Sequence, residues 1–203
     1  MRAIKNSFSP KTLLGVFPLI MLVISTPALS DYISTGLVAD KAVEVVSSDG
    51  FGTRLNVRLS GVEIEKAENG GDYEQVKLAL PEGELLVATT SEPGKPELPL
   101  LTRVLAIPGN CDLAVNVVSA SYEEYAGYKI VPAQGPKTKG QFANSTPLQI
   151  DEEVYGRDQF YPEKIALTGL PGIMRDLRLV TVSIAPVQFN PRRGILRVYS
   201  EIE

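Results

Sequence analysis

The chain of 203 residues is 44% hydrophobic and 22% charged, which excludes a disordered protein and is enough to build a buried core. It contains no histidine and one cysteine, Cys111, so Ser-His-Asp and Cys-His catalysis, a His-based or thiolate zinc site and an intrachain disulfide are excluded. Its formal net charge of −4 gives it no electrostatic reason to bind nucleic acid or anionic lipid. A carboxylate pair or a lysine base remains open for catalysis, but the sequence singles out neither. We therefore assign no catalytic residue, cofactor or metal site and expect no nucleic-acid partner.

Residues 1–30 have the pattern of a secretory signal peptide. Three basic residues and an apolar run over residues 13–24 precede Ala28 and Ser30, which are small residues at the two positions that a signal peptidase reads. The run is shorter than the ~20 residues that a membrane-spanning helix needs. The pattern predicts cleavage after Ser30, a single domain over residues 31–203, a secreted or periplasmic location and no membrane span. Loss of the three basic residues would change the net charge from −4 to −7.

The first half of the domain alternates apolar and polar residues between turn signals, which is typical of half-buried strands. We expect a strand over 42–48, a turn over 49–52, and a long strand over 55–64 with a bulge near Ser60 and Gly61. The sequence Glu-Asn-Gly-Gly-Asp at 68–72 predicts a tight hairpin turn. Further strands are expected over 73–80 and 84–90.

The middle of the chain is divided by prolines. Residues 91–99 contain three of them, which predicts an extended crossing within one domain rather than an interdomain linker. A strand over 100–107 should end at Pro108 and Gly109. A strand beginning at Asp112 should place Leu113, Val115 and Val117 on one face, and a short strand should cover 127–131. We interpret Cys111, in the turn between these strands, as a half-buried thiol.

Residues 132–147 are rich in proline, glycine and polar side chains and show no period, so they predict a long exposed loop of the kind that often has a function. Tyr155, Phe160 and Tyr161 follow it and are expected to attach the returning chain to the core. A short strand over 165–168 and a turn over 169–172 come next.

The stretch 176–203 is interpreted as a closing β-hairpin. Its expected arms contain Val180 to Ile184 and Leu196 to Ile202, and the turn between them is favoured by Pro191 and Gly194. A dibasic pair at 192–193 would then belong to the surface of this turn rather than to a processing site.

No segment after residue 30 repeats apolar residues with helical spacing. About nine to eleven short strand candidates, separated by glycine, proline and asparagine turns, predict an all-β fold. We expect an antiparallel β-sandwich or a partly closed barrel.

Three stretches carry a family resemblance: Gly94 to Pro108, then Asp151 to Tyr155 with Phe160 to Pro162, then Val180 to Tyr199. In this order and spacing the chain, from Gly36 to Glu203, resembles the N-terminal propeptide domain of gingipain-type secreted cysteine peptidases. The resemblance implies a β-sandwich prodomain that assists folding of its peptidase, covers the active-site cleft during export and is cut away on activation. The implied partner is a cognate cysteine peptidase domain in the same precursor, since these 203 residues hold no such domain.

Basic side chains of the expected loop are candidates for entering the specificity pocket of that partner. If the partner prefers basic side chains, as the best-known members of the family do, the candidates are Lys137 and Lys139, with Arg157 nearby. The more common explanation for such residues is that they are ordinary solvated charges on a loop. The alternative function is a free-standing secreted β-sandwich that binds glycans or mediates adhesion through aromatic residues such as Tyr122, Tyr125 and Tyr128.

Overall fold

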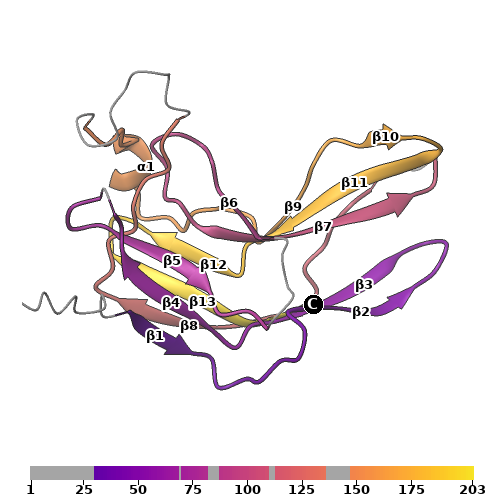
Figure 1. The fold of residues 1–203 in the computed structure, drawn as a ribbon, viewed down its shortest axis with the longest axis horizontal. Helices are drawn as coiled ribbons and strands as arrows, with labels where there is room; N and C mark the ends of the chain where they lie inside the picture. Colours follow the sequence, from indigo (N-terminus) through magenta and orange to yellow (C-terminus); the bar gives the residue numbers. More distant parts are fainter. Residues whose placement is uncertain (1–29, 69, 82–86, 110–112, 136–146) are drawn as a thin grey trace, which may run out of the picture.

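A computed structural model describes residues 30–203, except residues 69, 82–86, 110–112 and 136–146 (Figure 1). Residues 1–29, which hold most of the predicted signal peptide, and Cys111, Lys137 and Lys139 lie outside these described residues. The described strands form three antiparallel sheets, accompanied by one short helix. The predicted all-β antiparallel fold is therefore confirmed, and the separate sheets correspond to the sandwich rather than to the partly closed barrel.

The first sheet has the strand order β1-β4-β5. Its strands are β1 (Asp31–Ser34), β4 (Gly61–Lys66) and β5 (Glu74–Leu78). Alternating residues of β4, Val62 and Ile64, are buried, as a two-residue period requires. The predicted turn after β4 closes the β4–β5 hairpin, with Gly71 at a φ of +61° that favours glycine.

The second sheet has the order β12-β13-β3-β2, and β8 also pairs with β13. Its strands are β2 (Val43–Ser48), β3 (Thr53–Arg58), β8 (Ala120–Ala126), β12 (Val187–Asn190) and β13 (Ile195–Ile202). The predicted turn at 49–52 is present between β2 and β3, where Asp49 Oδ1 accepts hydrogen bonds from the N–H groups of Phe51 and Gly52, both at 2.8 Å.

The third sheet has the order β10-β11-β7-β6, and β9 also pairs with β11. Its strands are β6 (Val87–Thr89), β7 (Pro99–Ile107), β9 (Ala166–Thr168), β10 (Gly172–Met174) and β11 (Leu177–Ile184). β7 matches the predicted strand over 100–107 and ends, as expected, before Pro108.

Two clusters of buried side chains hold the sheets together. The first contains Ile33, Val62 and Phe189 and lies between the first and second sheets, while the second contains Leu101 and Val182 and lies between the second and third sheets. β13 supplies residues to both clusters and runs from the left side of the molecule to its middle (Figure 1). The last strand is thus the element on which both layers of packing depend.

The predicted closing hairpin is correct in its turn and wrong in its first arm. β12 and β13 pair antiparallel around the turn at 191–194, where Gly194 has a φ of +62° and the two arginines are exposed. Val180 to Ile184 instead belong to β11, which pairs with β7. Pro186 lacks an N–H group and interrupts the ladder, so the chain changes sheets between β11 and β12.

Three other expected strands differ in the structure. The stretch 55–64 is divided into β3 and β4, which belong to different sheets, instead of one bulged strand. Residues 113–119 form no strand, although Leu113 and Val115 pack against the second core, and the chain enters β8 only at Ala120. Residues 127–131 contain only an isolated bridge at Ile130. Alternation showed which side chains face the core but not whether a neighbouring strand was available.

The sequence also did not predict the helix α1 (Glu152–Gly156), which is too short to show a helical period. Asp151 caps it, accepting hydrogen bonds at 3.1 Å from the N–H groups of Glu153 and Val154. None of the helices in the described part of the chain is long and apolar enough to cross a membrane.

Candidate functional site

The candidate site is the base of the predicted loop, formed by the two described segments 130–135 and 147–162. The residues between them, 136–146, lie outside the described part of the chain and include Lys137 and Lys139. The structure therefore describes how the residues on either side of this stretch are held, and where Arg157 lies.

The first segment of the base is fixed by backbone hydrogen bonds on both sides. Val131 N–H donates to the Glu74 carbonyl at 2.9 Å, next to the start of β5. On the other side, Ala133 N–H donates to the carbonyl of Lys95 at 2.7 Å and Gly94 N–H donates to the carbonyl of Ala133 at 2.8 Å. Because residues 130–133 are also buried, the chain has a defined position where it leaves the core toward Gln134.

The side-chain amide of Gln134 closes the base by pairing with the backbone of Gln149 across the loop. Gln149 N–H donates to Gln134 Oε1 at 2.9 Å, and Gln134 Nε2 donates to the Gln149 carbonyl at 3.1 Å. Asp151 N–H donates in turn to the Gly94 carbonyl at 2.9 Å. The backbone of Gly94 is thus hydrogen-bonded to both segments of the base, to Ala133 in the first and to Asp151 in the second.

α1 completes the base and carries Arg157 at its C-terminal end. The Tyr155 hydroxyl donates to the Ile130 carbonyl at 2.8 Å, and burial raises the pKa of Tyr155 above its ordinary range. Arg157 follows the last helical residue, and its exposed guanidinium pairs with Glu153 one turn earlier. A surface pair of this kind contributes little to stability, so Arg157 is free to change partners.

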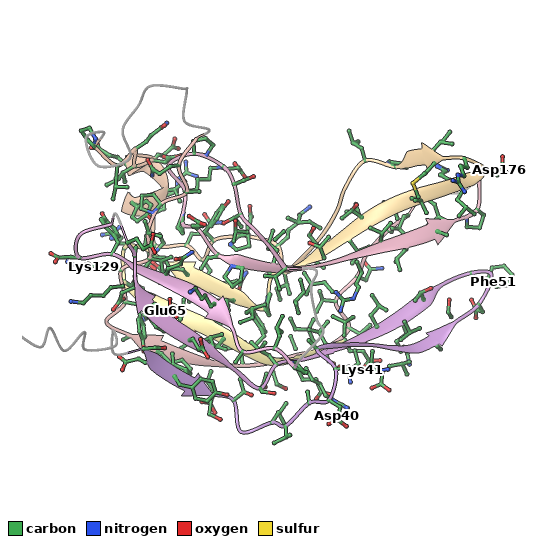
Figure 2. The ribbon with its side chains drawn as sticks, viewed as in Figure 1. Asp40, Lys41, Phe51, Glu65, Lys129 and Asp176 are labelled. Carbon is green, nitrogen blue, oxygen red and sulfur yellow. The ribbon has the colours of Figure 1, made fainter. Side chains whose placement is uncertain are left out.

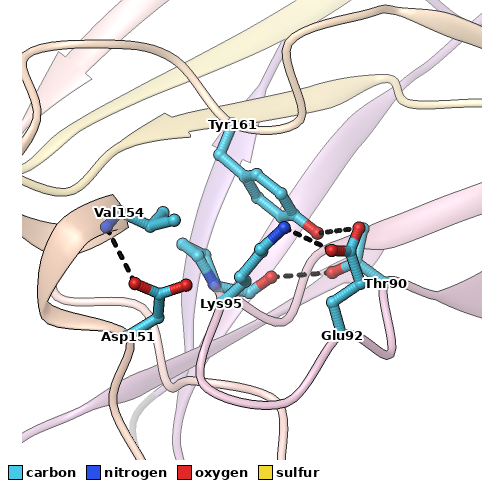
Figure 3. Close-up of polar contacts among 7 residues, drawn as sticks. Thr90, Glu92, Lys95, Asp151, Val154 and Tyr161 are labelled. Carbon is cyan, nitrogen blue, oxygen red and sulfur yellow. Dashed lines mark hydrogen bonds and ion pairs between the residues drawn. The ribbon is translucent and has the colours of Figure 1, made fainter.

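A cavity of about 540 Å³ lies beside the base, with Arg157 among its lining residues. Figure 3 shows its polar wall: the Glu92 carboxylate pairs with Lys95 and accepts from the Tyr161 hydroxyl at 3.5 Å, and the Lys95 ammonium lies 5.8 Å from the centre of the Tyr161 ring. Burial, and then the Glu92 charge, raises the pKa of Tyr161 to about 12. This wall is a set of satisfied pairs, with no nucleophile activated by a base.

A second cleft, of about 890 Å³, lies far from the base, between the β2–β3 and β7–β11 ribbons. Phe51 and Asp176 mark the ends of these ribbons in Figure 2. Apolar residues such as Leu105, Val115 and Val182 line the cleft. Among the residues that the structure describes, no group of three potential metal ligands is found there or elsewhere.

Of the three predicted site residues, the structure places only Arg157, at the loop base. Gln134, Gln149 and Asp151 were not singled out as site residues, although Asp followed by two glutamates is a helix-start signal. Tyr155 does attach the returning chain to the core, as expected.

Of the tyrosines named for the alternative function, Tyr122 is about half exposed and Tyr125 and Tyr128 are partly buried. Tyr125 and Tyr128 pack against the first core. Tyr122 packs edge-on against Tyr199, and its ring lies under the guanidinium of Arg197 at 4.3 Å.

Comparison with known proteins decides the family. The family model Propeptide_C25 matches residues 38–203. The chain belongs to the C25 propeptide family. The gingipain-type propeptide resemblance inferred from the sequence is thereby confirmed.

Curated relatives of this C25 propeptide are much longer than the chain. Gingipain R2 of Porphyromonas gingivalis is 30% identical over 160 residues, covering 79% of this chain and 21% of the relative. Gingipain R1 of the same organism is 36% identical over 150 residues, covering 74% and 14%. The chain thus spans about a fifth or less of the length of these relatives.

Two solved structures share the fold of the C25 propeptide. The complex of Porphyromonas gingivalis RgpB pro- and mature domains aligns with a TM-score of 0.69 and 27% identity over 81% of this chain and 83% of that chain. A structure addressing the zymogenic latency of gingipain K from Porphyromonas gingivalis aligns with a TM-score of 0.70 over 86% and 96%, and at 23% identity it shows the fold alone.

Proposed function

We propose that the chain is the inhibitory and folding-assisting propeptide of a cysteine endopeptidase and covers the active-site cleft until proteolysis removes it. The observation that carries the proposal is the closed loop base, in a domain whose solved relative is a complex of pro- and mature domains. Residues 1–30 act as the signal peptide, residues 31–203 as the propeptide, and the partner is a cognate peptidase domain of the same precursor. The site of action is secreted or periplasmic.

A blocking domain must present its contact residues in a fixed position, because ordering a flexible segment on binding lowers affinity. The hydrogen bonds of Gln134, Gln149 and Tyr155 fix both ends of the 136–146 stretch before any partner arrives. We assign Lys137, Lys139 and Arg157 to the contact with the cleft, one of them in the specificity pocket of a peptidase that prefers basic side chains.

The test is titration of the cognate peptidase with the full chain and with the variants Lys137→Ala, Lys139→Ala and Arg157→Ala. Loss of the residue that enters the pocket should raise the inhibition constant about tenfold or more, or ~1.4 kcal/mol. Lys66→Ala, which removes an exposed charge from β4, is the matched control and should leave inhibition unchanged.

Equal inhibition by all three variants would exclude these side chains as cleft contacts. Failure of the unmodified chain to slow the peptidase would reject the inhibitory function itself. That result would favour a free-standing secreted adhesion or glycan-binding module.

A further inference from the structure

The connection between β1 and β2, residues 35–42, contains Lys41 and has few hydrogen bonds to the rest of the domain. It joins the first sheet to the second, and Figure 2 shows Asp40 and Lys41 at its outer edge. Within the described part of the chain, the backbone hydrogen bonds from Gly36 to Lys41 go to hydroxyls. Gly36 and Leu37 donate to Ser34 and Thr35 at 3.2 and 3.4 Å, and Ala39 donates to Ser60 at 3.4 Å. Neither the N–H nor the exposed ammonium of Lys41 has a polar partner among the described residues.

The other described lysines lie in backbone that is already bonded. Lys66 and Lys77 belong to the paired strands β4 and β5. Lys129 donates its N–H to Glu74 Oε2 at 3.1 Å, and its carbonyl accepts from Glu74 N–H at 2.7 Å. Cleavage at any of these residues first requires the hydrogen bonds between paired strands, or those that join Lys129 to Glu74, to break.

Lys95 and Lys164 are also constrained. The carbonyl of Lys95 accepts from Ala133 in the loop base. Lys164 lies in a short stretch whose two ends are fixed. The Pro162 carbonyl accepts from the Gln188 side chain in β12, and the Ile165 carbonyl accepts from the N–H of Ala185, directly after β11. An endopeptidase binds its substrate as an extended strand. Lys41 has weakly held backbone before it and, after it, only the start of β2, an edge strand whose other residues are mostly exposed. Lys41 is therefore the described lysine at which the fewest contacts must break for cleavage.

Cleavage after Lys41 would not leave the fold intact. Ala42 is fully buried, and its carbonyl accepts the N–H of Arg58 at 2.9 Å. Hydrolysis adds one water across the Lys41–Ala42 bond, so that Lys41 gains a carboxylate and Ala42 gains an amine that is protonated at neutral pH. A buried ammonium without a partner is strongly unfavourable, so the start of β2 must leave the core.

β1 would then lose the covalent tether that keeps it in the first sheet. It is an edge strand of four residues with a single buried side chain, Ile33. A peptide with so little buried surface cannot offset the entropy cost of associating as a separate molecule. Ile33 belongs to the same core cluster as Ile130, whose carbonyl holds Tyr155, so loss of β1 weakens the support of the loop base.

We infer that the Lys41–Ala42 bond is a release point at which a lysine-preferring endopeptidase opens the domain and detaches β1. The inference rests on the proposed function, because opening the domain relieves inhibition only if the domain inhibits. The cleavage itself is a property of the chain alone and is tested without the cognate peptidase.

The experiment uses limited digestion of the full chain with a lysine-specific endopeptidase, in a background of Lys137→Ala and Lys139→Ala so that cuts report on described lysines. Mass spectrometry should identify Ala42 as the first new N-terminus within residues 31–203. Lys41→Ala should slow this first cut about tenfold or more, because the remaining sites open less often, whereas Lys129→Ala should change it less than about twofold. Lys41→Arg should resist the same enzyme but be cut at the same bond by an arginine-specific endopeptidase.

A first cut at another described lysine, or an unchanged rate in Lys41→Ala, would overturn the inference. So would retention of residues 31–41 by the cut chain on size-exclusion chromatography. Comparing the cut and uncut chains as inhibitors separates the two proposals. If the uncut chain never inhibits but is cut at Lys41, only the proposed function fails; if it inhibits but is cut elsewhere, only the release point fails.

Discussion

Single buried polar residues connect the loop base to the last strand. Gln188 is buried, and both ends of its amide are used: Nε2 donates to the Pro162 carbonyl at 2.7 Å, and Oε1 accepts from the Tyr199 hydroxyl at 2.6 Å. A buried amide that loses one partner keeps the cost of its removal from water. The Tyr199 hydroxyl therefore matters for stability although it lies in no catalytic site.

Tyr199→Phe is predicted to lower the free energy of unfolding by about 1–3 kcal/mol, because Gln188 Oε1 is left without a donor. Urea unfolding measures the loss. The control is Tyr122→Phe, since Tyr122 lies directly opposite Tyr199 in the β8–β13 pair, is half exposed and has no hydroxyl partner among the described residues. Equal losses in the two variants would mean that the buried hydrogen bond contributes nothing.

At the scale of elements, Gly94 is the point where the proline-rich crossing meets the returning loop. Its φ is +86°, and a Cβ atom added there would lie 2.8 Å from the backbone nitrogen of Asp151. A side chain at this position is unfavourable in two ways: the left-handed backbone costs about 1–2 kcal/mol, and the contact would push Asp151 away from the base.

Gly94→Ala is predicted to destabilise the domain by about 2 kcal/mol or more and to weaken inhibition, because the Asp151 N–H loses its bond to the Gly94 carbonyl. Denaturant unfolding and the inhibition constant measure the two effects. Gly50→Ala is the control, since a Cβ atom there meets nothing within 4 Å. A Gly94 variant as stable as the Gly50 variant would show that the crossing adapts without strain.

The sequence allowed the elements to be predicted better than their partners. The strand at 100–107, the turns at 49–52 and 191–194 and the hairpin after Lys66 were all visible, because glycine, proline and alternation act locally. The partner of Val180 to Ile184 was not, since alternation shows which face is buried but not which strand lies beside it. The Gln134–Gln149 contact was equally hidden, because it joins two residues of an aperiodic segment.

At the scale of the whole molecule, the burial of tyrosines in both cores and in the loop base makes the stability of the domain depend on pH in the alkaline range. Burial raises the pKa values of Tyr128, Tyr155, Tyr161 and Tyr199, which are distributed over the first core, the base and the second core. Each folded-state pKa lies above the unfolded value, so the fold holds these protons more tightly than the unfolded chain does. Their contribution is complete below the unfolded pKa and is lost as the pH rises through the folded pKa.

Tyr161 provides the sharpest test, because its pKa is raised from 10.0 to about 12 and the hydrogen bond from its hydroxyl to Glu92 is long, at 3.5 Å. The domain should lose stability between pH 10 and pH 12, and Tyr161→Phe should reduce that loss while changing stability little at neutral pH. Urea midpoints measured across this range give the comparison, with Tyr122→Phe as the control at an exposed ring. Lysine deprotonation affects all three proteins alike and cancels in the difference. Parallel pH profiles for the unmodified chain and Tyr161→Phe would show that this hydroxyl is no better protected from ionisation in the fold than in the unfolded chain.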